Sequence, residues 1–148
     1  MTMNILPPNS SAIKTRFAVK FIQAMKRLSK RRGMGDRYKR YRATRAAACV
    51  SMASAVGPEW AWSRAVLRKI KRRRLLRQFR VSRKRRLIER TTNPRQNLGF
   101  GQEEDLRGLV PGGKGMDYCS LLSETAHYIT CLQAQVQVMA DILHRSSP

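Results

Sequence analysis

Apolar side chains in the last third of the chain repeat with a heptad spacing. Their positions alternate by three and four residues over about six helical turns, which keeps one narrow line of side chains on a single side of a helix. This heptad seam comprises Leu122, Thr125, Ile129, Leu132, Val136, Met139 and Leu143. One helix cannot bury such a seam by itself, so the segment is predicted to be a dimerisation module.

A short helix and a Pro-Gly loop precede the long helix. The short helix is predicted over residues 102–110, and three acidic residues in its first turn interact favourably with the helix macrodipole. Residues 111–116 are predicted to be a loop. Asp117 is the predicted N-cap of the long helix, with Ser120 at the third helical position.

Positive charge dominates the chain and lies almost entirely in its first two thirds. The formal net charge is +22, and residues 1–95 hold 28 basic and 3 acidic side chains. Blocks of like charge repel each other unless an anionic partner neutralises them. Nucleic acid, the nuclear import machinery and acidic protein surfaces are therefore the natural partners. A solvated tail that only carries an import signal is an equal alternative to direct nucleic-acid contact.

Two dense basic clusters, at residues 69–74 and 83–86, are candidate nuclear-import signals. Such runs also occur in RNA-binding and ribosomal proteins. Residues 1–35 contain no acid and in composition resemble a mitochondrial presequence, but the density of basic clusters favours the nucleus. The basic residues of the two clusters are Lys69, Lys71, Arg72, Arg73, Arg74, Arg83, Lys84, Arg85 and Arg86.

Three helices are predicted within the basic region. The first, over residues 12–32, is amphipathic, and Asp36 is the predicted N-cap of an Ala-rich second helix that Gly57 and Pro58 end. The third begins near Pro58 and continues through the basic clusters. The apolar face of the first helix is formed by Phe17, Phe21, Met25 and Leu28, and that of the third by Trp60, Trp62, Val66, Leu67 and Ile70.

The predicted fold class is all-α, with a helix-loop-helix dimerisation module after a basic, helical and partly disordered N-terminal region. Because the apolar residues lie on separate helical stripes, one compact domain is not expected. The predicted divisions are a disordered lead at 1–11, the basic helical region at 12–90, a linker at 91–101, the helix-loop-helix domain at 102–144 and a tail at 145–148.

Several other classes of protein fit the sequence poorly. No apolar run approaches the roughly 20 residues that span a bilayer, and the N-terminus lacks the apolar core of a secretory signal. A membrane-surface or calmodulin-binding role for the basic amphipathic helices is a weak alternative. His127 and Cys131 share a helix face, but a zinc site needs three or four protein ligands. No catalytic, cofactor or metal site is predicted, and three cysteines do not form a disulfide framework.

The C-terminal motifs resemble a known family. The run from Leu106 to Gly113, followed by Met116-Asp117 and the heptad-bearing helix, is similar to the helix-loop-helix domain of plant atypical basic helix-loop-helix proteins. In particular, it looks like the proteins related to the growth-repressing partners of the increased-leaf-inclination regulators. The resemblance covers about residues 102–143, with looser support over 60–90.

This resemblance implies a parallel four-helix bundle made by two chains. Other helix-loop-helix proteins are the implied partners, in a heterodimer or a homodimer. The first helix of the motif would contribute Leu106, Leu109 and Val110, and the second Leu122, Ile129, Leu132 and Val136, continued by Met139 and Leu143 along the seam.

The basic region departs from that of DNA-binding members. An ungapped count places Thr92 where those members carry a base-reading Glu, and Thr92 lacks the carboxylate that accepts from a cytosine amino group. Pro94, Gly99 and Gly101 interrupt the continuous helix that such reading needs. The sequence therefore predicts a nuclear transcriptional regulator that antagonises DNA-binding partners. The family resemblance implies that the outcome is restraint of cell elongation, linked to brassinosteroid signals. The alternatives are a basic nucleic-acid-binding protein, such as an organellar ribosomal protein, and a homodimer that binds DNA non-specifically.

Overall fold

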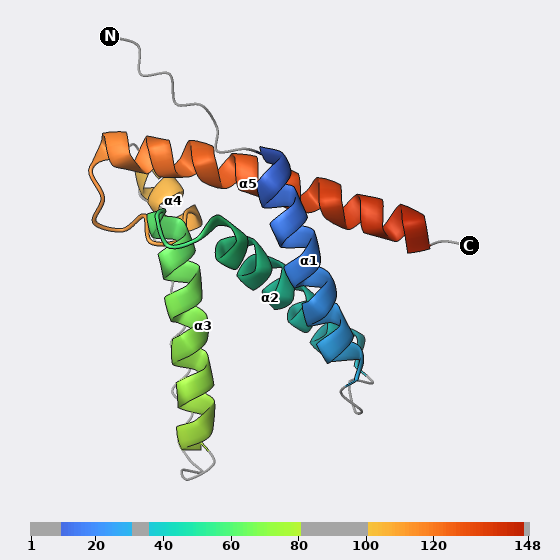
Figure 1. Ribbon diagram of the computed structural model, residues 1–148. Helices are drawn as coiled ribbons and strands as arrows, with labels where there is room; N and C mark the ends of the chain where they lie inside the picture. Colours follow the sequence, from blue (N-terminus) through green and yellow to red (C-terminus); the bar gives the residue numbers. More distant parts are fainter. Residues whose placement is uncertain (1–9, 31–35, 81–100, 147–148) are drawn as a thin grey trace.

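The computed structural model describes residues 10–30, 36–80 and 101–146, and within these ranges the chain contains five helices and no strand (Figure 1). The predicted all-α class is confirmed. The helices are α1 (Ser10–Ser29), α2 (Arg37–Val56), α3 (Ala61–Arg80), α4 (Gly101–Leu109) and α5 (Tyr118–Ser146). The predicted import cluster at 83–86, together with Thr92, Pro94 and Gly99, lies outside the described residues.

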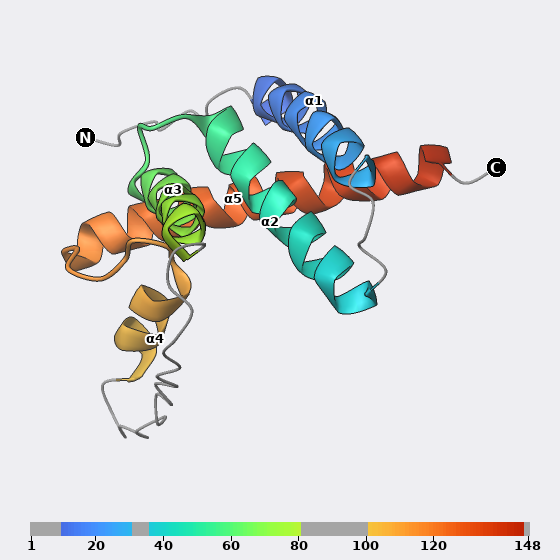
Figure 2. The same cartoon turned by 90° about the horizontal axis from the view of Figure 1, so that it is seen from below.

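The long helix α5 is the element against which the N-terminal helices pack. Helices α1, α2 and α3 each contact it, and α2 also contacts both α1 and α3 (Figure 1). In the view from below, α4 lies apart from α1 and α2 (Figure 2). Within the described ranges, no helix combines the length and apolar character needed to cross a bilayer.

A shared apolar core joins α1, α2, α3 and α5. Phe17 and Phe21 of α1 stack with ring centroids 5.5 Å apart, and Met52, Trp62 and Leu121 bring α2, α3 and α5 into the same core. Each such side chain, fully buried, contributes roughly 1.5–3 kcal/mol. The sequence predicts separate helical stripes, whereas in the structure the apolar faces meet.

Local signals in the sequence determine where α2 begins and ends. The Asp36 carboxylate accepts a hydrogen bond from the Tyr38 backbone N–H at 3.0 Å, which confirms the predicted N-cap. The helix ends at Gly57, whose φ of 94° suits a residue without Cβ, and its N–H donates to the Ala53 carbonyl at 3.1 Å. Between these caps, the small side chains of α2 allow its neighbours to approach closely.

Candidate partner-binding surface

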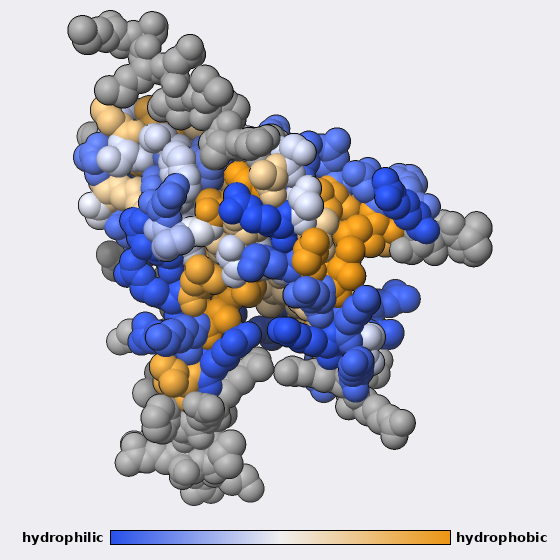
Figure 3. All heavy atoms as spheres, in the orientation of Figure 1, coloured by the Kyte–Doolittle hydropathy of each residue, from blue (hydrophilic) through white to orange (hydrophobic). Residues whose placement is uncertain are grey.

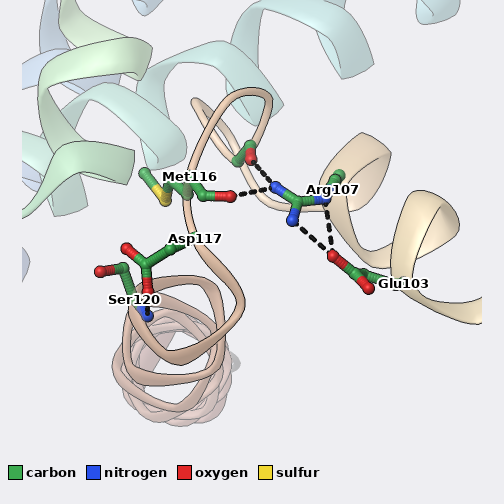
Figure 4. A network of polar contacts seen from close by, with 6 residues as sticks. Glu103, Arg107, Met116, Asp117 and Ser120 are labelled. Atoms are coloured by element: carbon green, nitrogen blue, oxygen red, sulfur yellow. Dashed lines mark hydrogen bonds and ion pairs between the residues drawn. The ribbon is translucent and has the colours of Figure 1, made fainter.

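Arg107 fixes the loop between α4 and α5. Its guanidinium donates to the Met116 carbonyl at 2.5 Å and to the Gly113 carbonyl at 3.3 Å, and it forms an ion pair with Glu103 at 2.5 Å (Figure 4). One side chain therefore ties the last turns of α4 to the far end of the loop. The planar guanidinium suits this role, because it presents several donors in a fixed geometry.

Two loop glycines allow the close approach of neighbouring backbone and side chains. Gly112 has a φ of 80°, and a Cβ there would lie 3.0 Å from the Ala65 Cβ of α3. At Gly113, a Cβ would lie 3.0 Å from the Arg107 carbonyl oxygen and 3.1 Å from Leu121 Cδ1. The Pro-Gly-Gly sequence therefore lets the loop pack against both α3 and α5.

The start of α5 follows the sequence prediction. The Asp117 carboxylate accepts a hydrogen bond from the Ser120 backbone N–H at 2.9 Å, as expected of an N-cap (Figure 4). Hydrogen bonds from the Ser120 side chain and backbone hold the pKa of Asp117 below its ordinary value. The carboxylate is therefore charged at the positive end of the helix dipole.

Helix α5 has an inner face that the N-terminal helices cover. This face follows the helical repeat and is formed by side chains that are buried or half-buried. Lys14 of α1 adds a polar contact beside it, donating to the Gln137 side chain at 2.6 Å. The inner face comprises Leu121, Tyr128, Cys131, Ala134 and Val138.

An exposed apolar line lies on another side of α5. It is formed by every second member of the predicted heptad seam, and the exposed fractions of its side chains run from 44% at Leu122 to 69% at Leu143. At 100° per residue it is rotated by roughly 140° from the centre of the inner face. This exposed stripe comprises Leu122, Ile129, Val136 and Leu143.

The remaining seam residues lie between these two faces. Thr125, Leu132 and Met139 are all half-buried, and Met139 packs against the core. The Thr125 hydroxyl donates to the Leu121 carbonyl at 2.6 Å. The seam is therefore divided, with one half facing outward and the other bordering the N-terminal helices.

The apolar residues near the end of α4 are also divided. Leu109 is 76% exposed, Leu106 is half-buried against the core, and Val110 is buried. Of these three side chains, only that of Leu109 is exposed in the single chain.

A polar contact that sequence reasoning missed joins α5 to the start of α3. Both oxygens of the Glu124 carboxylate accept backbone N–H groups, from Ala61 at 2.9 Å and from Trp62 at 3.0 Å. The carboxylate thus caps the first turn of α3 from another helix and interacts favourably with its dipole. Sequence spacing gave no signal for it, because the partners are more than 60 residues apart.

His127 completes the contact between α3 and α5. The Trp60 ring stacks on its imidazole with centroids 3.6 Å apart and planes 5° apart, and Trp62 Nε1 donates to His127 Nδ1 at 3.0 Å. Burial lowers the pKa of His127 against the opposing effect of the Glu124 carboxylate. The neutral imidazole is thus the form that accepts the indole N–H.

Cys131 belongs to the inner face of α5. Burial raises the pKa of its thiol to about 11, and its sulfur lies 3.8 Å from His127 Nδ1. In the part of the chain that the structure describes, no three His, Cys, Asp or Glu side chains are placed to hold a metal ion. His127 packs against Trp60 and Trp62, and Cys131 is buried in the inner face of α5.

The first predicted import cluster lies on α3. Its basic residues Lys69, Lys71, Arg72, Arg73 and Arg74 are all exposed to solvent. The second cluster lies outside the described residues, so the structure places only the first.

Comparison with known proteins finds one family that matches the N-terminal helices and two relatives that align with most of the chain. Residues 10–74 match the family described as IBH1-like, N-terminal domain, which covers α1, α2 and most of α3. The chain is 34% identical over 163 residues to "Transcription factor IBH1" of Oryza sativa subsp. japonica, an alignment that spans 90% of this chain and 79% of the relative. The protein of the same name in Oryza sativa subsp. indica matches with equal identity and coverage. No solved structure matches the chain.

Proposed function

Because the chain belongs to the IBH1 family of transcription factors, and so to transcriptional regulators rather than enzymes, we propose that it acts by dimerising with other helix-loop-helix proteins. The observation that carries this proposal is the exposed stripe of α5. A continuous line of large aliphatic side chains at heptad spacing is suited to a partner helix, and the N-terminal helices leave it uncovered.

The exposed stripe supplies a sufficient driving force for association. Covering what remains exposed of each of its four side chains contributes about 1–2 kcal/mol, and Leu109 of α4 adds a fifth such group. Two chains each burying this surface gain enough gross free energy to offset the several kcal/mol of lost translational and rotational freedom.

The proposed outcome of dimerisation is antagonism of DNA-binding partners in the nucleus. A heterodimer with this chain would contain one subunit without a base-reading Glu, because the corresponding position is Thr92. The family resemblance supports restraint of cell elongation, linked to brassinosteroid signals, as the biological result. Import into the nucleus is assigned to the basic clusters at 69–74 and 83–86.

The role of the exposed stripe can be tested with one charged substitution. Ile129→Asp places a carboxylate at a position that is 48% exposed in the single chain, so the chain should still fold. In a dimer the same carboxylate would be buried without a partner, which is very costly. We expect affinity for helix-loop-helix partners to fall by at least about 100-fold.

The measurement is calorimetric titration of the full chain against a panel of purified plant helix-loop-helix proteins. Thr130→Asp is the matched control, because Thr130 is exposed on the same turn but points about 100° away from Ile129. Equal partner affinity in the Ile129→Asp and Thr130→Asp chains would refute dimerisation through the stripe.

Binding to DNA provides the second test. The purified chain should show no preference for an E-box over scrambled DNA, although non-specific binding that weakens steeply with salt is expected from its charge. Mixed with a DNA-binding partner, it should lower the partner's E-box occupancy in a gel-shift titration at about 0.15 M salt. Selection of E-box DNA by the purified homodimer by a factor of roughly 10³ would contradict the proposal.

A further inference from the structure

A groove lies on the N-terminal helices, away from the exposed stripe. It is bounded by α1, α2 and α3, and has a volume of about 1070 Å³. Its walls are α1 and α3, and α2 runs between them (Figure 1). The face seen in this orientation carries apolar patches with hydrophilic side chains around them (Figure 3).

Six cations and no carboxylate line this basic groove. Each of the three helices contributes two of them, and all six are exposed. Within residues 10–30, 36–80 and 101–146, the one ion pair joins Arg107 to Glu103 and so involves none of the six. The cations are Lys20, Arg27, Lys39, Arg42, Arg73 and Arg74.

The floor of the basic groove is largely apolar and contains no aromatic ring, although Gln23, Ser51 and Ser54 also line it. Small side chains of α2 form its centre, and apolar side chains of the two flanking helices form its sides. All of these apolar side chains are half-buried or exposed, although they lie within a helical assembly. They are Ala24, Leu28, Ala43, Ala46, Ala47, Val50 and Ile70.

The volume of the groove is comparable with that of a short helical segment. An α-helix with its side chains is about 10 Å across and rises 1.5 Å per residue, so ten residues occupy roughly 1,200 Å³. The groove volume of about 1070 Å³ therefore matches two to three turns. Alanines on the floor let the backbone of such a helix approach α2 closely.

We propose that the basic groove binds an acidic amphipathic helix of a partner protein. The apolar side of that helix would lie on the floor, and carboxylates on its flanks would meet the cations of α1 and α3. Nucleic acid fits less well. A duplex offers no apolar face to the alanines, and single strands bind through stacking on aromatic rings, which the floor lacks.

The test uses the full chain and a labelled synthetic peptide of 18 residues. Its Leu residues recur every three or four positions, and its other positions are Glu. The comparison peptide has the same composition with its Leu residues distributed around the helix. We expect the amphipathic peptide to bind at least about 10-fold more tightly in fluorescence anisotropy at roughly 0.15 M salt.

Two groove variants separate this site from general charge attraction. The Lys20→Gln/Arg73→Gln chain removes one cation from each wall and keeps Arg42, whose guanidinium lies 5.7 Å from the Tyr38 ring centroid. Ala46→Glu places a carboxylate on the exposed floor. Each variant should weaken peptide binding about 5- to 10-fold, because several partly exposed charge contacts are lost or opposed.

Matched controls keep the same changes in charge outside the groove. Arg16→Gln/Arg40→Gln removes two exposed cations from α1 and α2, and Ala12→Glu adds an exposed carboxylate on α1. These controls, and Ile129→Asp on the stripe, should bind the peptide as the wild type does. The proposal fails if the comparison peptide binds equally well, if groove and control variants lose equal affinity, or if a DNA duplex displaces the peptide at lower concentration than unlabelled peptide does.

Discussion

The Glu124 carboxylate is predicted to hold the start of α3 against α5. Its two oxygens accept the N–H groups of Ala61 and Trp62 at 2.9 and 3.0 Å, and Trp62 is only 1% exposed. Removing the carboxylate by Glu124→Ala leaves the Trp62 N–H without its partner. Hydrogen bonds to charged groups contribute about 1.5–3 kcal/mol each, and the two share one side chain, so we expect a loss of about 2–4 kcal/mol.

Glu124→Gln retains one oxygen acceptor but loses the charge, so its stability should lie between those of the wild type and Glu124→Ala. Urea unfolding followed by tryptophan fluorescence is the assay, because both tryptophans of the chain lie at this contact. With an m-value of about 2 kcal/mol/M, a loss of 3 kcal/mol lowers the midpoint by about 1.5 M.

Glu104→Ala is the matched control, because Glu104 is an exposed carboxylate in the first turn of α4. Surface substitutions of this kind change stability by no more than about 0.5 kcal/mol. If Glu124→Ala moves the midpoint no further than Glu104→Ala does, the contact between Glu124 and α3 does not stabilise the fold.

Two further predictions concern acid sensitivity and cellular location. Burial places the pKa of His127 in the folded chain below the unfolded value of 6.5. Between these two pKa values the unfolded chain binds more protons than the folded chain, so the free energy of unfolding should fall as the pH drops below about 6.5. The His127→Gln substitution should flatten this pH dependence, whereas His144→Gln, at an exposed position, should not. The measurement is the urea midpoint from pH 8 to pH 5. If the midpoint changes equally with pH in the wild type and both variants, the assignment to His127 is wrong. Replacing the basic residues of clusters 69–74 and 83–86 by Ala should leave a large fluorescent fusion in the cytoplasm, and unchanged nuclear accumulation would contradict the import assignment.

Local signals in the sequence predicted the helices and their caps well. Asp36 and Asp117 accept the expected N-cap hydrogen bonds, and Gly57 ends α2 with a positive φ. Each of these features depends on residues within a few positions of one another, so spacing and side-chain chemistry suffice to predict them.

Local spacing and side-chain chemistry do not predict the inner face of α5. Cys131 and Ala134 are small or weakly apolar, so they did not stand out beside the large aliphatic side chains of the heptad seam. Their burial depends on α1, α2 and α3, which are distant in the sequence. The same holds for Glu124, whose role as a cap for α3 appears only once tertiary packing brings residues 61 and 62 to it.

In the proposed dimer, Arg107 would also affect the thermodynamics of association. Its bonds to the Gly113 and Met116 carbonyls order the loop in the single chain, before any partner arrives. Fixing the backbone of one residue requires about 1–2 kcal/mol of conformational entropy, and the loop contains several residues. Since this entropy cost of ordering the loop is already part of the folding of the chain, it is not subtracted again from the free energy of binding. A loop ordered in advance would thus let the exposed stripe hold the proposed partner more tightly than its area alone would allow.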